Sequence, residues 1–124
     1  MSLTTEGIYA EKKARELLKR NGYQLQQADW IGKKDGKYTI FEVKERELFA
    51  PPPFLGTGLD KSQVYLRTQL LEDLGLRTYL IVFEKNTSNV YGQWLDKLEQ
   101  TTYFDTKNGI RVYNIKEFVV LNNK

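Results

Sequence analysis

The chain has 124 residues, of which 40% are hydrophobic and 28% charged, a composition typical of a soluble globular protein with one domain. It holds no cysteine and no histidine, which excludes disulfides, the usual zinc sites, thiol nucleophiles and every triad that uses histidine. Any catalysis must therefore use carboxylates, lysine, arginine, tyrosine or hydroxyl groups, and carboxylates without histidine suit hard cations such as Mg²⁺ or Mn²⁺.

The net charge of +3 falls in the first part of the chain, since residues 1–46 hold ten basic and seven acidic residues. The basic residues gather in Lys12–Arg20 and Gly32–Lys37, two clusters that suit contact with a phosphate backbone. The nucleic-acid-binding candidates in them are Lys12, Lys13, Lys33 and Lys34. A solvated helix face and a lysine-rich turn explain these clusters equally well.

Nothing in the sequence predicts a membrane protein or a secreted one. No stretch approaches the roughly 20 apolar residues of a membrane span, and no signal-peptide pattern opens the chain. The absence of cysteine is also compatible with the cytoplasm. We therefore expect a cytoplasmic protein with no membrane partner.

The first expected element is a helix over residues 7–22, where four apolar residues recur at helical spacing: Ala10, Ala14, Leu17 and Leu18. Asn21-Gly22 is a typical helix end. Alternating side chains predict a first strand over Tyr23–Ile31, and the Asp-Gly pair within Lys33–Lys37 predicts a hairpin turn.

The stretch YTIFEVKERE, from Tyr38 to Glu47, is then a second strand, antiparallel to the first. Side chains alternate between the two faces of a strand, so Ile40, Glu42 and Lys44 share one face. That face changes from apolar to charged halfway along the strand. A buried strand that reaches a polar cleft predicts this change, and so does a strand that runs out into solvent.

The rest of the chain predicts one helix and three more strands. Phe49–Gly58 has the composition of a loop, and Asp60 is placed to cap a helix that runs to Gly75. Thr78–Glu84 is nearly all apolar, which indicates a strand buried on both faces and parallel to the second strand. Residues 101–115 predict a hairpin that turns at Asn108-Gly109.

Asp29, Glu42 and Lys44 form a constellation that suits phosphodiester hydrolysis. The hairpin brings Asp29, near the end of the first strand, toward Glu42, and the two-residue step returns Lys44 to the face of Glu42. Such hydrolysis needs acidic oxygens that hold a divalent cation, and a cationic side chain that positions water and offsets charge. A salt bridge of Glu42 and a solvent-exposed Lys44 are the structural alternatives.

This pattern resembles the PD-(D/E)XK nuclease superfamily, in particular its small Holliday-junction-resolvase-like and phage-type members. Asp29 followed by Glu42-Val43-Lys44 is similar to the D…ExK motif. Gly7-Ile8-Tyr9-Ala10-Glu11 ahead of Gly22-Tyr23 is similar to the first helix of the family, and Lys61-Ser62-Gln63 to its later helix. The resemblance covers residues 6–85; Ala28 stands where the family often has proline.

The resemblance implies an α/β (α+β) fold with a mixed central sheet flanked by helices and an αβββαβ restriction-endonuclease-like core. We expect one domain over residues 1–124, with the core at about 6–85 and a β-rich C-terminal extension at about 86–124. The implied activity is a Mg²⁺-dependent DNA endonuclease, in which Mn²⁺ substitutes for Mg²⁺. Branched, duplex or single-stranded DNA and RNA stay open as substrates, and a junction substrate would require a homodimer.

The resemblance also assigns roles. Asp29, Glu42 and the carbonyl of Val43 would bind the cation with help from Glu11, although Glu6 flanks the same helix stripe. Lys44 would orient the attacking water. Gln63 heads a leucine stripe expected to face the sheet (Leu66, Leu70 and Leu74). It would position that water or a neighbouring ligand, and its structural alternative is to satisfy a buried backbone group. Lys61 is a weaker candidate for a phosphate contact. The alternatives are a catalytically inactive relative that binds nucleic acid or a protein partner, and an accessory interaction protein with a coincidental motif.

Overall fold

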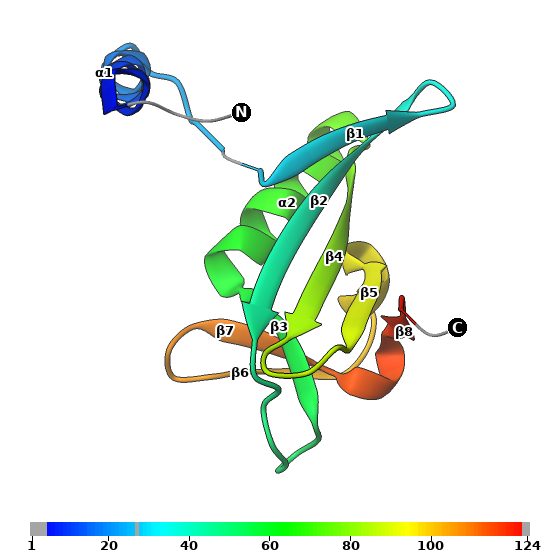
Figure 1. Cartoon of the computed structure of the whole chain (residues 1–124). Coiled ribbons are helices and arrows are strands. Elements are labelled where there is room, and N and C mark those ends of the chain that lie inside the picture. Colours follow the sequence, from blue (N-terminus) through cyan, green and yellow to red (C-terminus); the bar gives the residue numbers. More distant parts are fainter. Residues whose placement is uncertain (1–4, 27, 123–124) are drawn as a thin grey trace.

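The computed structural model describes residues 5–26 and 28–122. Figure 1 shows its elements and labels all of them except α3 and η1. In chain order they are α1 (Thr5–Arg20), β1 (Trp30–Lys34), β2 (Lys37–Arg46), β3 (Gly56–Asp60), α2 (Lys61–Leu74), β4 (Arg77–Glu84), β5 (Val90–Trp94), α3 (Leu95–Leu98), β6 (Tyr103–Asp105), β7 (Ile110–Asn114), the 3₁₀ helix η1 (Ile115–Glu117) and β8 (Val119–Val120). The first six follow the expected αβββαβ order, and the mixed α+β class is confirmed.

The strands form two sheets. The larger has the order β1-β2-β4-β5-β8, and the smaller has the order β3-β7-β6. In the larger sheet β2 and β4 are parallel, and the other pairs are antiparallel. The predicted hairpin between β1 and β2 is confirmed, with Asp35 and Gly36 at positive φ in its turn. The parallel pair and the late hairpin, β6–β7, are confirmed as well. The strands after residue 86 thus belong to both sheets.

The predicted first strand, Tyr23–Ile31, was wrong in its bounds. β1 begins at Trp30, which lies opposite Phe41, and the ladder with β2 ends there. Beyond this point a side chain replaces the backbone ladder, because the Val43 N–H donates a 2.8 Å hydrogen bond to Oδ2 of Asp29. The carboxylate thus takes the place of a strand partner beside Val43.

The prediction of a loop up to Gly58 was also wrong, because Gly56–Asp60 is the almost fully buried strand β3. It pairs with β7 along its whole length. A Cβ atom on Gly58 would lie 1.7 Å from the carbonyl oxygen of Arg111, and one on Gly56 would lie 2.2 Å from that of Tyr113. These glycines therefore permit close packing of two backbones and do not mark a flexible loop.

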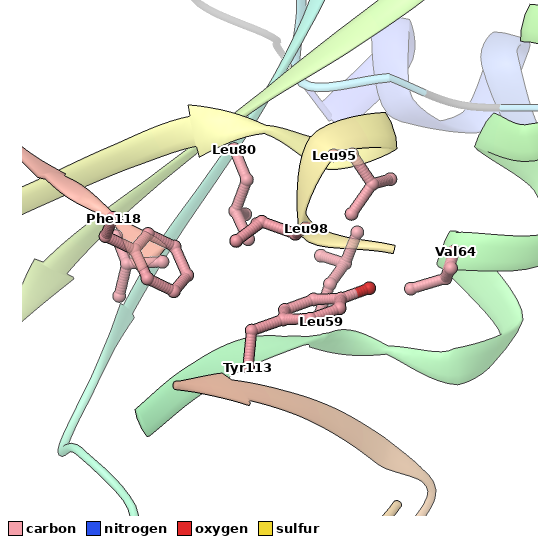
Figure 2. Close-up of a cluster of buried hydrophobic side chains, with 8 residues drawn as sticks. Leu59, Val64, Leu80, Leu95, Leu98, Tyr113 and Phe118 are labelled. Atoms are coloured by element: carbon pink, nitrogen blue, oxygen red, sulfur yellow. The ribbon is translucent and has the colours of Figure 1, made fainter. Parts of the chain in front are cut away.

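The main core lies between one face of the larger sheet and the elements that cover it (Figure 2). It contains residues of β3, α2, β4, α3 and β7 together with Phe118: Leu59, Val64, Leu80, Val82, Leu95, Leu98, Tyr113 and Phe118. The other face of β4 is not fully covered, since Tyr79 and Ile81 are half-buried and Phe83 is 44% exposed. The prediction that both faces are buried was therefore wrong.

Helix α2 occupies the predicted span, but two details of its prediction were wrong. It buries Val64 and Arg67, whereas Leu74 of the predicted leucine stripe is 68% exposed. Asp60 precedes the helix but makes no side-chain cap hydrogen bond. The helix ends as expected at Gly75, which adopts the left-handed conformation and donates to the last carbonyls.

Helix α1 stands apart from both sheets in Figure 1. Its side chains from Tyr9 to Arg20 are all exposed, including Leu17 and Leu18 of the predicted apolar stripe. The stripe is therefore not buried against the sheet. In the described part of the chain, no helix is long and apolar enough to cross a membrane.

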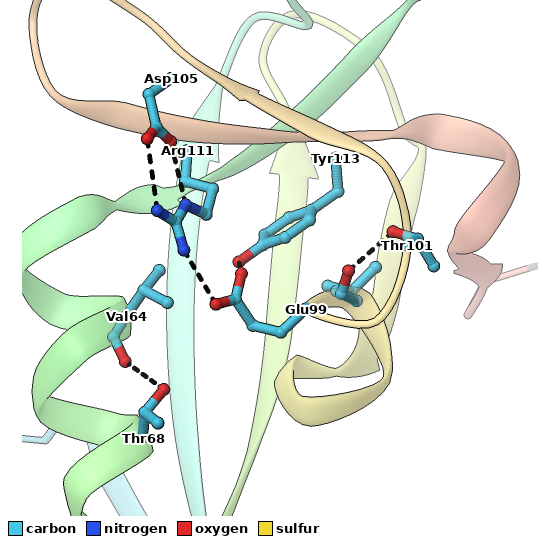
Figure 3. Close-up of polar contacts among 8 residues, drawn as sticks. Val64, Thr68, Glu99, Thr101, Asp105, Arg111 and Tyr113 are labelled. Atoms are coloured by element: carbon cyan, nitrogen blue, oxygen red, sulfur yellow. Dashed lines mark hydrogen bonds and ion pairs between the residues drawn. The ribbon is translucent and has the colours of Figure 1, made fainter.

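A polar cluster ties the smaller sheet to α3 (Figure 3). Arg111 of β7 donates to both carboxylate oxygens of Asp105 and, at 2.9 Å, to Oε1 of Glu99. The hydroxyl of Tyr113 donates a 2.7 Å bond to Oε2 of Glu99, and burial together with this bond raises the pKa of Tyr113. The hydrogen bonds of this cluster thus satisfy the polar ends of buried Arg111 and Tyr113 at the edge of the core.

Candidate functional site

Asp29 and Glu42, predicted from the D…ExK pattern, lie together in the structure. Glu42 points from β2 toward the covered face of the sheet and is only 1% exposed. Asp29 directly precedes β1 and is held by the Val43 N–H at 2.8 Å. Burial raises the pKa of Glu42 above its ordinary value of 4.5; Arg67 opposes this, and the charge and hydrogen bonding of Asp29 raise it further. The charge of Asp29 therefore affects the protonation of Glu42.

Arg67 of α2 is the third member of the site, and the sequence analysis missed it. Its Nε atom donates a 2.7 Å hydrogen bond to Oε1 of Glu42. Its Nη1 atom donates a 2.9 Å bond to Oε1 of Gln26, which precedes β1. The available signal was helical spacing, since Arg67 follows the core residue Val64 by three positions. The predicted leucine stripe instead indicated another face of α2 as the buried one.

Lys44 follows Glu42 by two residues and lies on the same face of β2, half-buried, opposite Val82 of β4. Among the residues that the structure describes, it has no hydrogen bond and no ion pair. Arg46, two residues further, is half-buried as well, and burial lowers the pKa of its guanidinium while the charge of Asp60 opposes the shift. One face of β2 thus presents a carboxylate and then two cations.

Gln63 lies in the first turn of α2 and is half-buried. Its Oε1 atom is buried and accepts no hydrogen bond from any described residue. A buried amide oxygen without a donor is costly in a stable fold, and this is common where a group serves a ligand. Lys61, also half-buried, has its N–H bonded to the carbonyl of Gly109, and its charge helps to lower the pKa of Asp105.

The structure does not bring Glu11 to Asp29 and Glu42. Glu11 is exposed on α1, where it lines a hollow together with Leu18, Leu25 and Gln26. Its role as a metal ligand stays a prediction. The side chain of Glu6, the alternative, lies outside the part of the chain that the structure describes.

The predicted nucleic-acid-binding lysines are exposed on separate elements. Lys12 and Lys13 lie on α1, with the Lys13 ammonium 4.8 Å from the ring centre of Tyr9. Lys33 and Lys34 lie at the end of β1, beside the hairpin turn. All four can contact a phosphate backbone without desolvation of a buried group.

The carboxylate oxygens of Asp29 and Glu42 suit one small hard cation. Within residues 5–26 and 28–122, no group of three or more acidic side chains gathers as a metal cluster. Mg²⁺ does not need such a cluster, because one or two carboxylates, with water or phosphate oxygens, complete its shell. Oδ2 of Asp29 accepts from the Val43 N–H and Oε1 of Glu42 accepts from Arg67, so a cation at this site would bind through Oδ1 of Asp29 and Oε2 of Glu42. A bound cation would also relieve the repulsion between the two carboxylates.

Comparison with known proteins gives a structural likeness and no sequence match. The fold is similar to the 1.6 Å structure of Hjc, a Holliday junction resolvase from the archaeal hyperthermophile Archaeoglobus fulgidus. The TM-score is 0.46 at 14% sequence identity, and the match covers 87% of this chain and 88% of that one. No protein-family model matches the chain, and no curated protein sequence does. The functional conclusion therefore depends on the residues of the chain itself.

Proposed function

We propose that the protein is a metal-dependent endonuclease that hydrolyses phosphodiester bonds in DNA. The observation that carries this proposal is the placement of Asp29 beside Glu42, because Oδ2 of Asp29 accepts a 2.8 Å hydrogen bond from the N–H of Val43, the residue that follows Glu42 on β2. Two neighbouring carboxylates, one of them buried, repel each other, and the single charge of Arg67 beside Glu42 offsets only one of the two negative charges. Such a pair is the usual setting for a catalytic divalent cation.

Each residue of the site has a task that follows from its position. Asp29 and Glu42 would hold Mg²⁺, or Mn²⁺ in its place, with the carbonyl of Val43 as a further oxygen ligand. When bound, the cation lowers the pKa of water and offsets negative charge on the phosphate. Lys44, whose ammonium has no hydrogen bond within the described structure, would orient the attacking water and stabilise the developing charge.

Gln63 supports the same arrangement from α2. Its buried Oε1 atom lacks a donor among the described side chains and backbone groups, so it can accept a hydrogen bond from a water molecule. We assign it the positioning of that water. Lys61, at the N-terminal end of the same helix, is a candidate phosphate contact.

DNA is the proposed substrate, bound through exposed lysines on the hairpin and on α1: Lys12, Lys13, Lys33 and Lys34. Branched DNA is the first form to test, because the motif set resembles resolvase-like nucleases. Resolution of a four-way junction requires two cuts, so we expect a homodimer if a junction is the substrate.

The decisive experiment compares cleavage of supercoiled plasmid, duplex, single-stranded DNA and a synthetic four-way junction, in Mg²⁺ and in EDTA. Glu42→Ala and Lys44→Ala should abolish the Mg²⁺-dependent cleavage. Glu47→Ala changes an exposed residue directly after the end of the same strand and should cleave normally. Equal cleavage by the Glu42→Ala protein would place the activity at another site or in a contaminant.

A second candidate function is DNA binding without cleavage. The observation that favours it is the ion pair of Arg67 with Glu42, which places a permanent cation on a proposed metal ligand. A non-cleaving protein would bind DNA with an affinity that EDTA leaves unchanged. It would also bind no Mn²⁺ in calorimetry, whereas the nuclease would bind it through Asp29 and Glu42.

A further inference from the structure

The guanidinium of Arg67 lies inside the proposed metal site and not on its rim. The side chains of Arg67 and Glu42 are each only 1% exposed, and the contact between them is a 2.7 Å hydrogen bond. Arginine keeps its charge at any pH that proteins tolerate. Glu42 therefore has a positively charged partner before any metal ion arrives.

A buried ion pair adds little net stability compared with apolar residues of similar size, although removal of one partner alone is costly. Removal of two charges from water costs about as much as their attraction returns, and well-packed apolar residues often serve such a position equally well. The core already contains leucine, valine and tyrosine around α2 and β4. An ion pair at this position suggests a use in the site itself.

We propose that Arg67 is a built-in competitor of the divalent cation at Glu42, and that it sets a low metal affinity for the site. This inference rests on the proposed metal-dependent function. Asp29 and Glu42 carry two negative charges, and Arg67 offsets one of them. A divalent cation that binds Glu42 must either share the carboxylate with the guanidinium or displace it, and both raise the free energy of the bound state.

Gln26 holds the competitor in place. Its Oε1 atom accepts a 2.9 Å hydrogen bond from Nη1 of Arg67, while Nε of Arg67 donates to Glu42. The guanidinium thus joins α2, β2 and the segment that precedes β1. A change at Gln26 removes this hydrogen bond and so makes displacement of the guanidinium from Glu42 easier.

The test is Mn²⁺ binding by the full-length protein, measured by calorimetry and by the electron paramagnetic resonance signal of free Mn²⁺. Arg67→Gln removes the charge but keeps hydrogen-bond donors, and it should bind Mn²⁺ roughly tenfold more tightly or better. Arg67→Lys keeps the charge and should bind like the unmodified protein. Arg77→Gln is the matched control, because Arg77 pairs with Asp96 and touches neither carboxylate.

Gln26→Ala provides a second measurement that does not disturb the core, since Gln26 is exposed. It should tighten Mn²⁺ binding in the same direction as Arg67→Gln and by less. Circular dichroism establishes that each variant is folded. If Arg67→Gln fails to fold, the Mn²⁺ affinity of Gln26→Ala tests the competitor role: tighter binding than by the unmodified protein supports it, and equal or weaker binding overturns it.

The outcomes separate this inference from the proposed function. Equal or weaker Mn²⁺ binding by folded Arg67→Gln, with DNA cleavage by the unmodified protein, overturns the competitor role alone. Tighter binding by the variant without cleavage by the unmodified protein supports the competitor and overturns the nuclease. Absence of Mn²⁺ binding by both proteins overturns both.

Discussion

The Nε atom of Arg67 donates a 2.7 Å hydrogen bond to Oε1 of Glu42, and each side chain is only 1% exposed. The pair joins the middle of α2 to the middle of β2, one residue before Val43, whose N–H donates to Asp29. If one partner is removed, the other becomes a buried charge without its principal counter-ion, which is far costlier than the net contribution of the pair.

Arg67→Met should therefore lower the free energy of unfolding by about 3–5 kcal/mol. The double variant Arg67→Met with Glu42→Leu should recover most of this loss, because neither charge then remains buried. Urea unfolding of the two single variants and the double variant measures the coupling.

The control for this cycle is Arg77→Met, which breaks a partly exposed pair with Asp96 whose arginine side chain is 39% exposed. It should cost about 1 kcal/mol or less. A double variant that is no more stable than Arg67→Met would show that packing, and not charge, dominates at this position.

Much of the scaffold could be predicted from sequence because local signals are strong there. Asp35-Gly36 specifies the hairpin turn, Gly75 ends α2, and the apolar run of Thr78–Glu84 marks β4. These signals place Asp29 and Glu42 on neighbouring segments, which the structure shows. They do not depend on distant parts of the chain.

The features that could not be predicted from the sequence depend on packing between distant parts of the chain. Gly56–Asp60 forms a strand because β7, about fifty residues later, lies against it. Val64 and Arg67 form the buried face of α2. Arginine is rarely buried, so the sequence does not predict Arg67 as a core residue unless its buried partner Glu42 is known. The position of α1 also could not be predicted, because its apolar stripe is not covered by the sheet.

Gly58→Ala tests the close packing of β3 on β7. An added Cβ atom would meet the carbonyl oxygen of Arg111 at 1.7 Å, so the two strands must separate. We expect a loss of about 3 kcal/mol or more in the free energy of unfolding. Gly109→Ala, at φ +82° in open space, is the control and should cost about 1 kcal/mol. Equal losses in the two variants would contradict the packing explanation.

Gln63→Met separates a functional role of Gln63 from a structural one. The variant keeps the volume and removes a buried oxygen that lacks a donor in the described structure, so stability should stay equal or rise by about 1 kcal/mol. DNA cleavage should fall, because the variant can no longer accept a hydrogen bond from water. The exposed Gln69→Met should change neither quantity. Loss of stability in Gln63→Met, with normal cleavage, would make Gln63 a structural residue.

Lys33→Ala with Lys34→Ala tests the hairpin as a DNA contact. Each lost phosphate contact should reduce the slope of log affinity against log salt concentration by about 0.9 on duplex DNA. The double variant should therefore bind more weakly at low salt and with a slope smaller by up to about 1.8. Lys97→Ala with Lys107→Ala changes two exposed lysines elsewhere and serves as the control. An unchanged slope in the hairpin variant would exclude these lysines from the interface.

Asp105→Asn tests the polar cluster of Figure 3 through its pH dependence. The hydrogen bonds from Arg111 hold the pKa of Asp105 below its ordinary value of 3.8, although burial opposes the shift. A carboxylate whose pKa is lowered by folding stabilises the protein above its unfolded pKa, and this contribution is lost as the pH falls through the folded pKa.

The unmodified protein should therefore be more stable than Asp105→Asn at pH 7, by about 0.5–1 kcal/mol, because the Asp105 side chain is 31% exposed. The difference should shrink once the pH falls below 3.8 and should be lost as the pH falls through the lowered pKa of Asp105 in the folded protein. Asp73→Asn, which changes an exposed carboxylate on α2, should show little difference at either pH. Thermal unfolding at several pH values measures both variants, and a constant difference for Asp105→Asn would mean that its ion pair with Arg111 does not contribute.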